Sequence, residues 1–136
     1  MGLYLAVFEG DDELDGVEVG SYADFALFRD AVVSHLERGA AGSRFPTLII
    51  HSDCDGKWTP EEAGTLATEL DVIAESFASL PPVSLDGWKA EVAKMFGIRL
   101  ENLGNCFFDV DGEPLLERFS QLARLSQKRN LPILFQ

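Results

Sequence analysis

The chain has 136 residues, of which 46% are hydrophobic, and its formal net charge is −12. That length is enough for one domain with a core of its own, and the composition excludes a disordered or fibrous chain. No apolar run approaches the roughly 20 residues that a membrane-spanning helix needs. We therefore expect a single domain over residues 1–136 that does not enter a membrane.

The N-terminus and the cysteines favour a cytoplasmic protein. Residues 1–8 lack the basic start and the small-residue cleavage site of a signal peptide, and acidic residues follow them directly. Cys54 and Cys106 form neither a disulfide framework nor a metal-spaced set. A reducing compartment fits this cysteine usage best.

Negative charge is concentrated in the first part of the chain. Residues 1–75 hold 16 of the 23 acidic residues and only four basic residues, whereas residues 76–136 are balanced. One run of acidic residues contains no basic residue: Glu9, Asp11, Asp12, Glu13, Asp15 and Glu18. Such a run either keeps the protein soluble as a solvated loop or steers a basic partner to this surface. Nucleic acid is a poor partner because its phosphates would be repelled.

Strands and helices are predicted in alternation from the N-terminus. Leu3–Phe8 is predicted as a strand, and the acidic segment up to Gly20 as a loop with a short extended piece near its end. Ser21 is an N-cap with Asp24 three residues later, which predicts a helix that ends at Gly39.

The stretch from residue 46 to residue 62 specifies its geometry most fully. Thr47–Ile50 lacks alternation, which predicts a strand covered on both faces. Asp55 and Gly56 form a turn dipeptide. Thr59 is then the N-cap of a helix, with Pro60 at the first helical position and Glu62 completing a capping box.

The second half of the chain continues the same pattern. Asp86 is predicted to cap a short helix, Asn105–Val110 to form a strand, and Pro114 to begin a last helix. Leu131–Phe135 is predicted as a final strand, and its proline favours an edge or a strand start. The expected fold class is α+β, a single domain with a mixed sheet of about four strands and three to four helices packed on it.

One candidate chemistry is calcium binding by the loop that starts at His51. Counting from His51, Asp53 falls at position three, Asp55 at five, Gly56 at six and Glu62 at twelve, as in an EF-hand loop. His51 stands where that loop needs an aspartate. The predicted entering element is also a strand, whereas an EF-hand needs a helix.

A second candidate is phosphoryl transfer by one of two Asp-x-Asp-Gly turns, at residues 53–56 and 109–112. Each follows an apolar segment predicted as a strand, which is similar to the nucleophile loop of haloacid dehalogenase-type phosphatases. The threonine that follows in that pattern is replaced by Lys57 or Glu113, and no clear downstream acidic metal motif follows. Turn chemistry alone explains both motifs.

The remaining reactive and aromatic residues indicate no catalytic site. Cys54 near His51 suggests an activated thiol, but residues three apart on a strand point to opposite faces. Trp58 and Trp88 are either packing residues or interface anchors.

Six blocks of sequence together resemble a known family: residues 2–5, 19–25, 42–47, 51–58, 109–117 and 131–135. These blocks read Gly-Leu-Tyr-Leu, Val-Gly-Ser-Tyr-Ala-Asp-Phe, Gly-Ser-Arg-Phe-Pro-Thr, His-Ser-Asp-Cys-Asp-Gly-Lys-Trp, Asp-Val-Asp-Gly-Glu-Pro-Leu-Leu-Glu and Leu-Pro-Ile-Leu-Phe. Over nearly the whole chain they are similar to the immunity protein 70 family of bacterial polymorphic toxin systems. The resemblance implies an α+β protein that binds and neutralises a cognate toxin made beside it, and it brings no catalytic site.

The sequence therefore leads to one main hypothesis, a non-enzymatic immunity protein without a cofactor or metal. Its expected partner is a cognate toxin domain, for which a basic nuclease is one candidate. We expect the acidic segment to steer that partner and the central turn to contact it. The predicted toxin-binding residues are Asp11, Asp12, Glu13 and Asp15 in the acidic segment, and Asp53, Asp55 and Trp58 in the turn.

Two alternatives stay open at this stage. The first is a small metal-dependent phosphohydrolase, or a calcium-binding protein, that uses Asp53 and Asp55. The second is a general acidic scaffold with no toxin partner.

Overall fold

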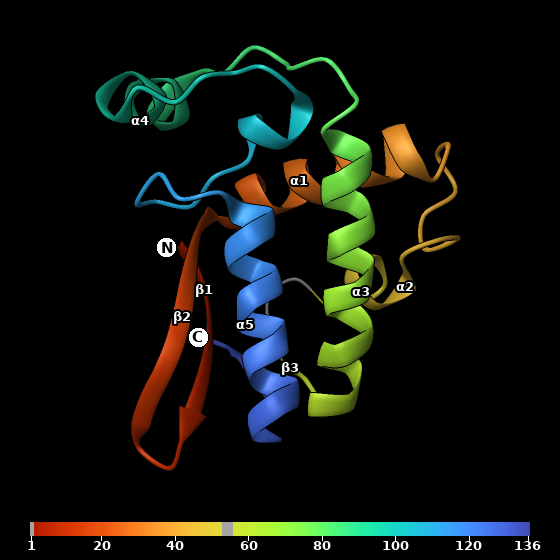
Figure 1. The fold of residues 1–136 in the computed structure, drawn as a ribbon, viewed down its shortest axis with the longest axis vertical. Helices are drawn as coiled ribbons and strands as arrows, with labels where there is room; N and C mark the ends of the chain where they lie inside the picture. Colours follow the sequence, from red (N-terminus) through yellow and green to blue (C-terminus); the bar gives the residue numbers. More distant parts are fainter. Residues whose placement is uncertain (1, 53–55) are drawn as a thin grey trace.

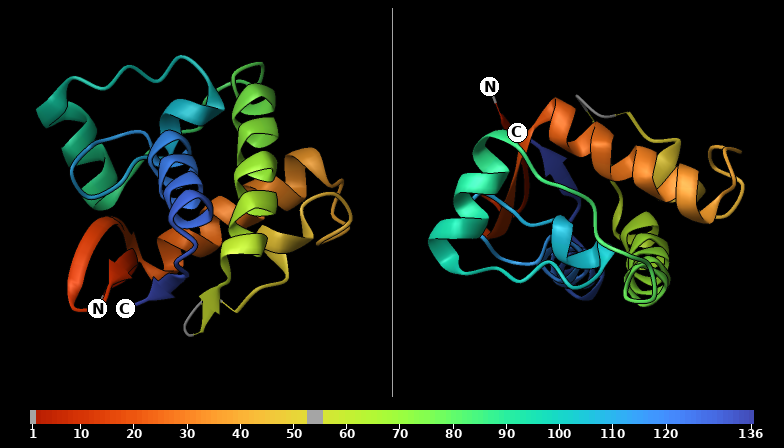
Figure 2. Two further views of the ribbon diagram at one scale, coloured as in Figure 1. Left: turned by 60° about the horizontal axis from the view of Figure 1, so that its bottom comes forward. Right: turned by 90° about the horizontal axis from the view of Figure 1, so that it is seen from above.

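The computed structural model describes residues 2–52 and 56–136, in which a small sheet packs against helices (Figure 1). Its strands are β1 Gly2–Glu9, β2 Asp12–Ser21, β3 Lys57–Trp58 and β4 Ile133–Phe135. Its helices are α1 Tyr22–Leu36, α2 Pro46–Ile49, α3 Pro60–Phe77, α4 Gly87–Phe96, the 3₁₀ helix η1 Leu103–Cys106 and α5 Leu115–Arg129. Helices α3 and α5 run side by side, and α1 crosses them in a separate layer (Figures 1 and 2).

The four strands form one sheet in the order β2-β1-β4-β3. Every pairing is antiparallel, with Leu5 opposite Phe135 and Lys57 opposite Leu134. The predicted α+β class and the strand number are confirmed, but the predicted mixed sheet is wrong. The sheet is wholly antiparallel because β4 returns from α5 beside β1, rather than crossing over in parallel.

Most of the acidic segment belongs to a β-hairpin. Gly10 adopts φ +63° in the turn, and β2 then runs from Asp12 to Ser21 beside β1. The prediction of a loop is therefore wrong beyond the turn. Val17 and Val19 are buried while Glu18 faces outward, so the period-two alternation of a strand is present within this acidic run.

The predicted helix starts at Ser21 and Thr59 are confirmed in detail, whereas Asp86 occupies the N-cap of α4 without a side-chain hydrogen bond and α5 begins one residue after Pro114. The Ser21 hydroxyl accepts a hydrogen bond from Asp24 N at 3.1 Å, and the Asp24 carboxylate accepts one from Ser21 N at 2.8 Å. Thr59 and Glu62 form the same reciprocal box at the start of α3. Both boxes satisfy backbone N–H groups that a helix leaves unpaired, and both depend only on local sequence.

The predicted strand at Thr47–Ile50 is wrong, because this segment forms most of the short helix α2. Pro46 occupies the first helical position, and Glu69 on α3 supplies the acceptors. Its carboxylate accepts hydrogen bonds from Thr47 N at 3.2 Å and Leu48 N at 3.0 Å. A carboxylate from another helix therefore satisfies the N–H groups at the start of α2.

The predicted strand at Asn105–Val110 is also wrong. Its first residues belong to η1, which starts with a capping box between Asn102 and Asn105. The only pairing in the predicted strand is an isolated bridge from Phe108 to Pro114. The apolar run misled the prediction because Cys106, Phe107 and Phe108 are buried on an irregular backbone.

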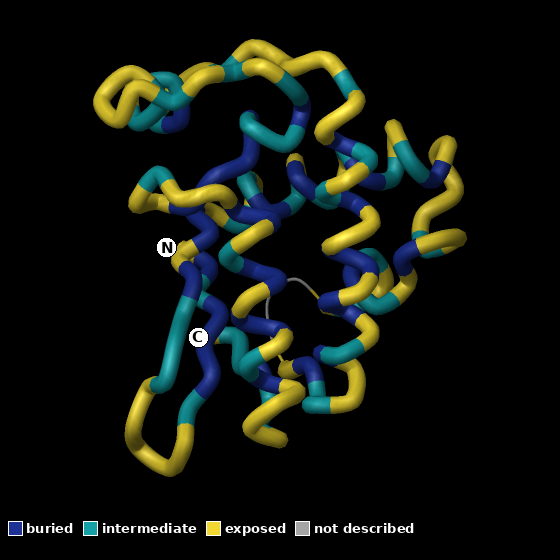
Figure 3. The backbone as a smooth tube through the Cα atoms, in the orientation of Figure 1, coloured by how far each residue is buried: buried dark blue, intermediate teal, exposed yellow. Residues whose placement is uncertain are grey.

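The core lies between the sheet and the helices, and the residues that form it are dark blue in Figure 3. Its largest fully buried side chains are Trp58, Phe25, Phe28, Phe77 and Phe119. Burying each such side chain contributes about 2–3 kcal/mol to the free energy of folding, because its apolar surface is removed from water. In contrast, the only buried residue of α4 is Lys89, so this helix lies at the edge of the core.

Candidate interaction surface

The predicted steering residues lie in the turn and the first part of β2, in the β1–β2 hairpin whose turn is at the bottom of Figure 1. Asp11, Asp12 and Glu13 are all exposed. Burial raises the pKa of Tyr4 to about 12, and a hydrogen bond to the Glu13 carboxylate adds to this rise. Glu13 is thus held in place by the neighbouring strand, whereas Asp11 and Asp12 are available to a partner.

Asp15 differs from the other predicted steering residues because it forms an ion pair within the chain. Arg118 on α5 donates to both of its carboxylate oxygens, from Nη2 to Oδ1 at 3.1 Å and from Nη1 to Oδ2 at 3.4 Å. Arg118 Nη2 also donates to Gly16 O at 3.0 Å. The hydrogen bond from Arg118 to Asp15 raises the pKa of Arg118 further. Asp15 therefore holds β2 and α5 together.

Trp58 is fully buried, with an exposed fraction of 0%. Its indole N–H donates to Thr47 O at 3.0 Å, and its ring lies 5.6 Å from the ring of Phe119. A buried ring offers no surface to a partner. Of the two roles considered for Trp58, packing residue or interface anchor, its burial supports the packing role.

The predicted contact residues Asp53 and Asp55 lie outside the described residues, as does Cys54. Glu62 belongs to the described part of the proposed calcium loop. Its carboxylate accepts a hydrogen bond from Thr59 N, and this hydrogen bond lowers the pKa of Glu62. The ring nitrogens of His51 lie 2.7 Å from Ser52 O and Lys57 O. These two groups already have structural partners.

The second Asp-x-Asp-Gly motif forms the predicted tight turn. Asp109 is 3% exposed, and its Oδ1 accepts hydrogen bonds from Asp111 N at 2.9 Å and Glu113 N at 3.0 Å. Gly112 adopts φ +80°, which favours glycine. The motif follows η1 and an irregular segment rather than a strand, so it lacks the strand-to-loop setting of the phosphatase pattern.

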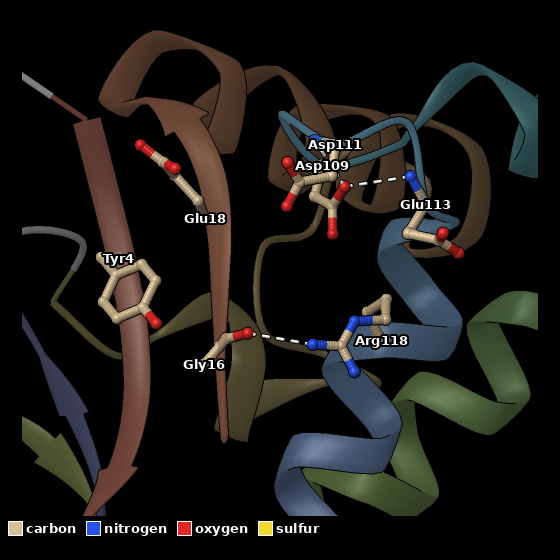
Figure 4. Close-up of a pocket in the computed structure, with 7 residues that line it drawn as sticks. All are labelled: Tyr4, Gly16, Glu18, Asp109, Asp111, Glu113 and Arg118. Atoms are coloured by element: carbon tan, nitrogen blue, oxygen red, sulfur yellow. Dashed lines mark hydrogen bonds between the residues drawn. The ribbon is translucent and has the colours of Figure 1, made fainter. Parts of the chain in front are cut away.

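A pocket of about 650 Å³ lies between β2, the 109–113 turn and the start of α5 (Figure 4). It is lined by Tyr4, Gly16, Glu18, Asp109, Asp111, Glu113 and Arg118. The ring of Tyr4 covers Gly16 so closely that a Cβ there would lie 2.1 Å from the tyrosine Oη. Sequence analysis missed this pocket because its residues come from two regions that are far apart in the sequence, 4–18 and 109–118, and the acidic turn was the only local signal.

A second pocket of about 470 Å³ lies between α1, residues 83–86 and η1. At its wall, Lys89 is 9% exposed and donates from Nζ to Cys106 O at 3.3 Å. The ammonium group lies 4.8 Å from the centre of the Phe107 ring, and burial lowers the pKa of Lys89. These contacts attach α4 to the core.

Neither pocket is arranged as a metal centre. Within residues 2–52 and 56–136, no group of three or more His, Cys, Asp or Glu residues could hold a metal ion. Over the same residues, no helix is long and apolar enough to cross a membrane.

The fold and this surface define a small α+β protein with a rigid core and an acidic, pocketed face. The chain belongs to the immunity protein 70 family, whose family model matches residues 3–135, almost the whole sequence. The resemblance seen in the sequence blocks is thereby confirmed. Searches of curated proteins and of solved structures found no match.

Proposed function

We propose that this protein binds a cognate toxin domain directly and blocks its activity, with no covalent bond made or broken. The observation that carries the proposal is membership of an immunity protein family over residues 3–135. An immunity protein needs a stable, preorganised surface, since preorganisation lowers the cost of ordering on binding. The buried aromatic core and the four-stranded antiparallel sheet fit this requirement.

The charge of the protein favours a basic toxin, such as a nuclease. The net charge is −12, and Asp11 and Asp12 are exposed at the end of the hairpin. A negative field of this kind raises the association rate with a positively charged partner. We propose that the hairpin end steers the toxin and that neutralisation takes place in the cytoplasm.

Co-expression with the adjacent toxin tests this function. The chain should restore growth of cells that express the toxin domain encoded beside its gene, and a tagged chain should retain that domain in a pull-down. An unrelated toxin domain of similar charge is the control, because general electrostatic attraction would retain both. Absence of both rescue and retention would refute the proposal.

A further inference from the structure

We propose that the 650 Å³ pocket binds a basic side chain of the toxin, and that exposed apolar residues on α4 and in the 109–113 turn pack around the bound segment. This inference rests on the proposed function and names the surface that performs it. The acidic pocket is the one lined by Tyr4, Gly16, Glu18, Asp109, Asp111, Glu113 and Arg118. The apolar rim consists of Met95, Phe96 and Val110, which are exposed.

The first argument is an Asp109 carboxylate oxygen that is open to the pocket. Oδ1 of Asp109 accepts two backbone hydrogen bonds, whereas Oδ2 has no hydrogen-bond partner among the described residues. In Figure 4 the carboxylate bonded to Glu113 N directs its other oxygen into the space above Arg118. This oxygen keeps its capacity to accept a hydrogen bond, and no buried side-chain oxygen or nitrogen among the described residues is left without a partner. A cationic donor entering the pocket would therefore form a charge-assisted hydrogen bond with it.

The second argument is the balance of charge. Four carboxylates line the pocket, those of Glu18, Asp109, Asp111 and Glu113. The one cation among the lining residues, Arg118, donates to Asp15 and Gly16 O on the β2 side and also interacts electrostatically with Asp109 and Glu113. The pocket is therefore negative overall. Because these carboxylates form no metal-holding group, a guanidinium or ammonium on a flexible side chain fits better than a metal ion.

The third argument is the apolar rim beside these charges. Met95 is 74% exposed and Phe96 is 57% exposed, although both are large apolar side chains. A Cβ placed on Gly112 would lie 2.9 Å from Phe96 Cδ2, so the phenyl ring packs directly on the acidic turn. Exposed apolar residues next to polar groups mark protein interaction sites, where buried anchors provide most of the binding energy.

The rim is held in a fixed position relative to the pocket. Trp88 Nε1 on α4 donates to Asp24 Oδ2 at 3.0 Å, and Lys89 binds Cys106 O. Val110 N donates to Glu18 O at 3.1 Å, which joins the turn to β2. The two parts of the surface are thus preorganised for one partner that carries a basic residue beside an apolar one.

Matched variants test the surface against the adjacent toxin domain in catalytically inactive form. The pocket variant is Asp111→Asn with Glu113→Gln, and the rim variant is Met95→Ser. The control is Glu61→Gln with Glu75→Gln on α3, which changes the net charge equally on the other side of α5 from the pocket. We expect Kd to rise about 30-fold for the pocket variant and about 10-fold for the rim variant, with less than about 3-fold for the control. Equal Kd values for the pocket variant and the control would overturn the proposal.

A peptide probe separates failure of this inference from failure of the proposed function. N-acetyl-Leu-Arg-amide at millimolar concentration should shift the amide NMR signals of Glu18, Asp111 and Glu113, whereas N-acetyl-Leu-Glu-amide should not. If the wild-type chain binds no toxin but shows these shifts, the proposed function fails and the pocket chemistry stands. If it binds toxin while the pocket variant binds equally well and no shifts occur, the function stands and the pocket is refuted. Circular dichroism of each variant checks that it is folded.

Discussion

Arg118 Nη2 lies 3.1 Å from Asp15 Oδ1, which joins β2 to α5 between residues 103 positions apart in the sequence. Both side chains are about three-quarters shielded from solvent, and the contact involves both carboxylate oxygens. This pair fixes one wall of the acidic pocket. Asp15, which the sequence analysis predicts as a steering residue, therefore also has a structural role in this ion pair.

Removing this ion pair should lower stability measurably. We expect Asp15→Asn to reduce the free energy of unfolding by about 1 kcal/mol, since a bidentate, partly buried pair exceeds an ordinary surface pair. A double-mutant cycle with Arg118→Gln, measured by urea denaturation, should give a coupling energy of similar size. Asp12→Asn is the exposed control and should change stability little. Additive effects of the two substitutions would contradict the assigned role.

Glu37 should stabilise the loop that leads into α2. Its carboxylate is 3% exposed and accepts hydrogen bonds from Gly42 N, Arg44 N and Phe45 N, at 2.9 to 3.1 Å. Burial alone would raise the pKa of Glu37, but these hydrogen bonds outweigh burial and lower it below the ordinary 4.5. Glu37→Gln should therefore lower the free energy of unfolding at pH 7 by about 2 kcal/mol.

The pH dependence of this effect has a definite sign. Because the pKa is lower in the folded state, the stabilisation by Glu37 is complete above the unfolded value of 4.5 and is lost as pH falls through the folded pKa. The difference between wild type and Glu37→Gln should thus be largest at pH 7 and shrink towards about pH 3. Urea denaturation at both pH values measures it, with Glu75→Gln as the exposed control.

Local features of the fold were predictable from the sequence, whereas contacts between distant segments were not. The boxes at Ser21–Asp24 and Thr59–Glu62 were predicted because all their partners lie within three residues. The segment from Thr47 was misread as a strand because the carboxylate that caps α2 comes from Glu69. The acidic pocket escaped prediction for the same reason, since Arg118 meets Asp15 only in the folded chain.

Trp58 should affect stability rather than binding. Trp58→Phe removes the hydrogen bond to Thr47 O and leaves unfilled volume beside Phe119, so we expect a loss of about 2 kcal/mol in stability. The affinity for toxin should stay within about 2-fold of wild type, because changes to residues outside an interface usually leave binding unchanged. Isothermal titration of the folded variant measures the affinity. A large loss of affinity in a variant that is still folded would show that Trp58 contributes to toxin binding.

Tyr4 should titrate late at alkaline pH. In Tyr22→Phe it is the only tyrosine, so ultraviolet absorbance reports its ionisation alone. We expect a midpoint near 12, with Glu13→Gln moving it towards the ordinary 10.0 because one cause of the rise is removed. The folded state then binds the extra proton between these values, so its stability should fall as pH rises from 10 to 12. Circular dichroism at each pH separates ionisation in the folded state from unfolding.

Charge reversal at the hairpin end tests steering without disturbing the ion pair at Asp15. Asp11 and Asp12 are exposed, and neither takes part in an ion pair among the described residues. In Asp11→Lys with Asp12→Lys, the association rate with a basic toxin should fall about 10-fold at low salt, while the dissociation rate stays close to wild type. The difference should nearly disappear at about 0.5 M salt, where exposed charges are screened. Glu61→Lys with Glu75→Lys is the matched control, and equal slowing by both variants would show that total charge, rather than the hairpin end, determines the association rate.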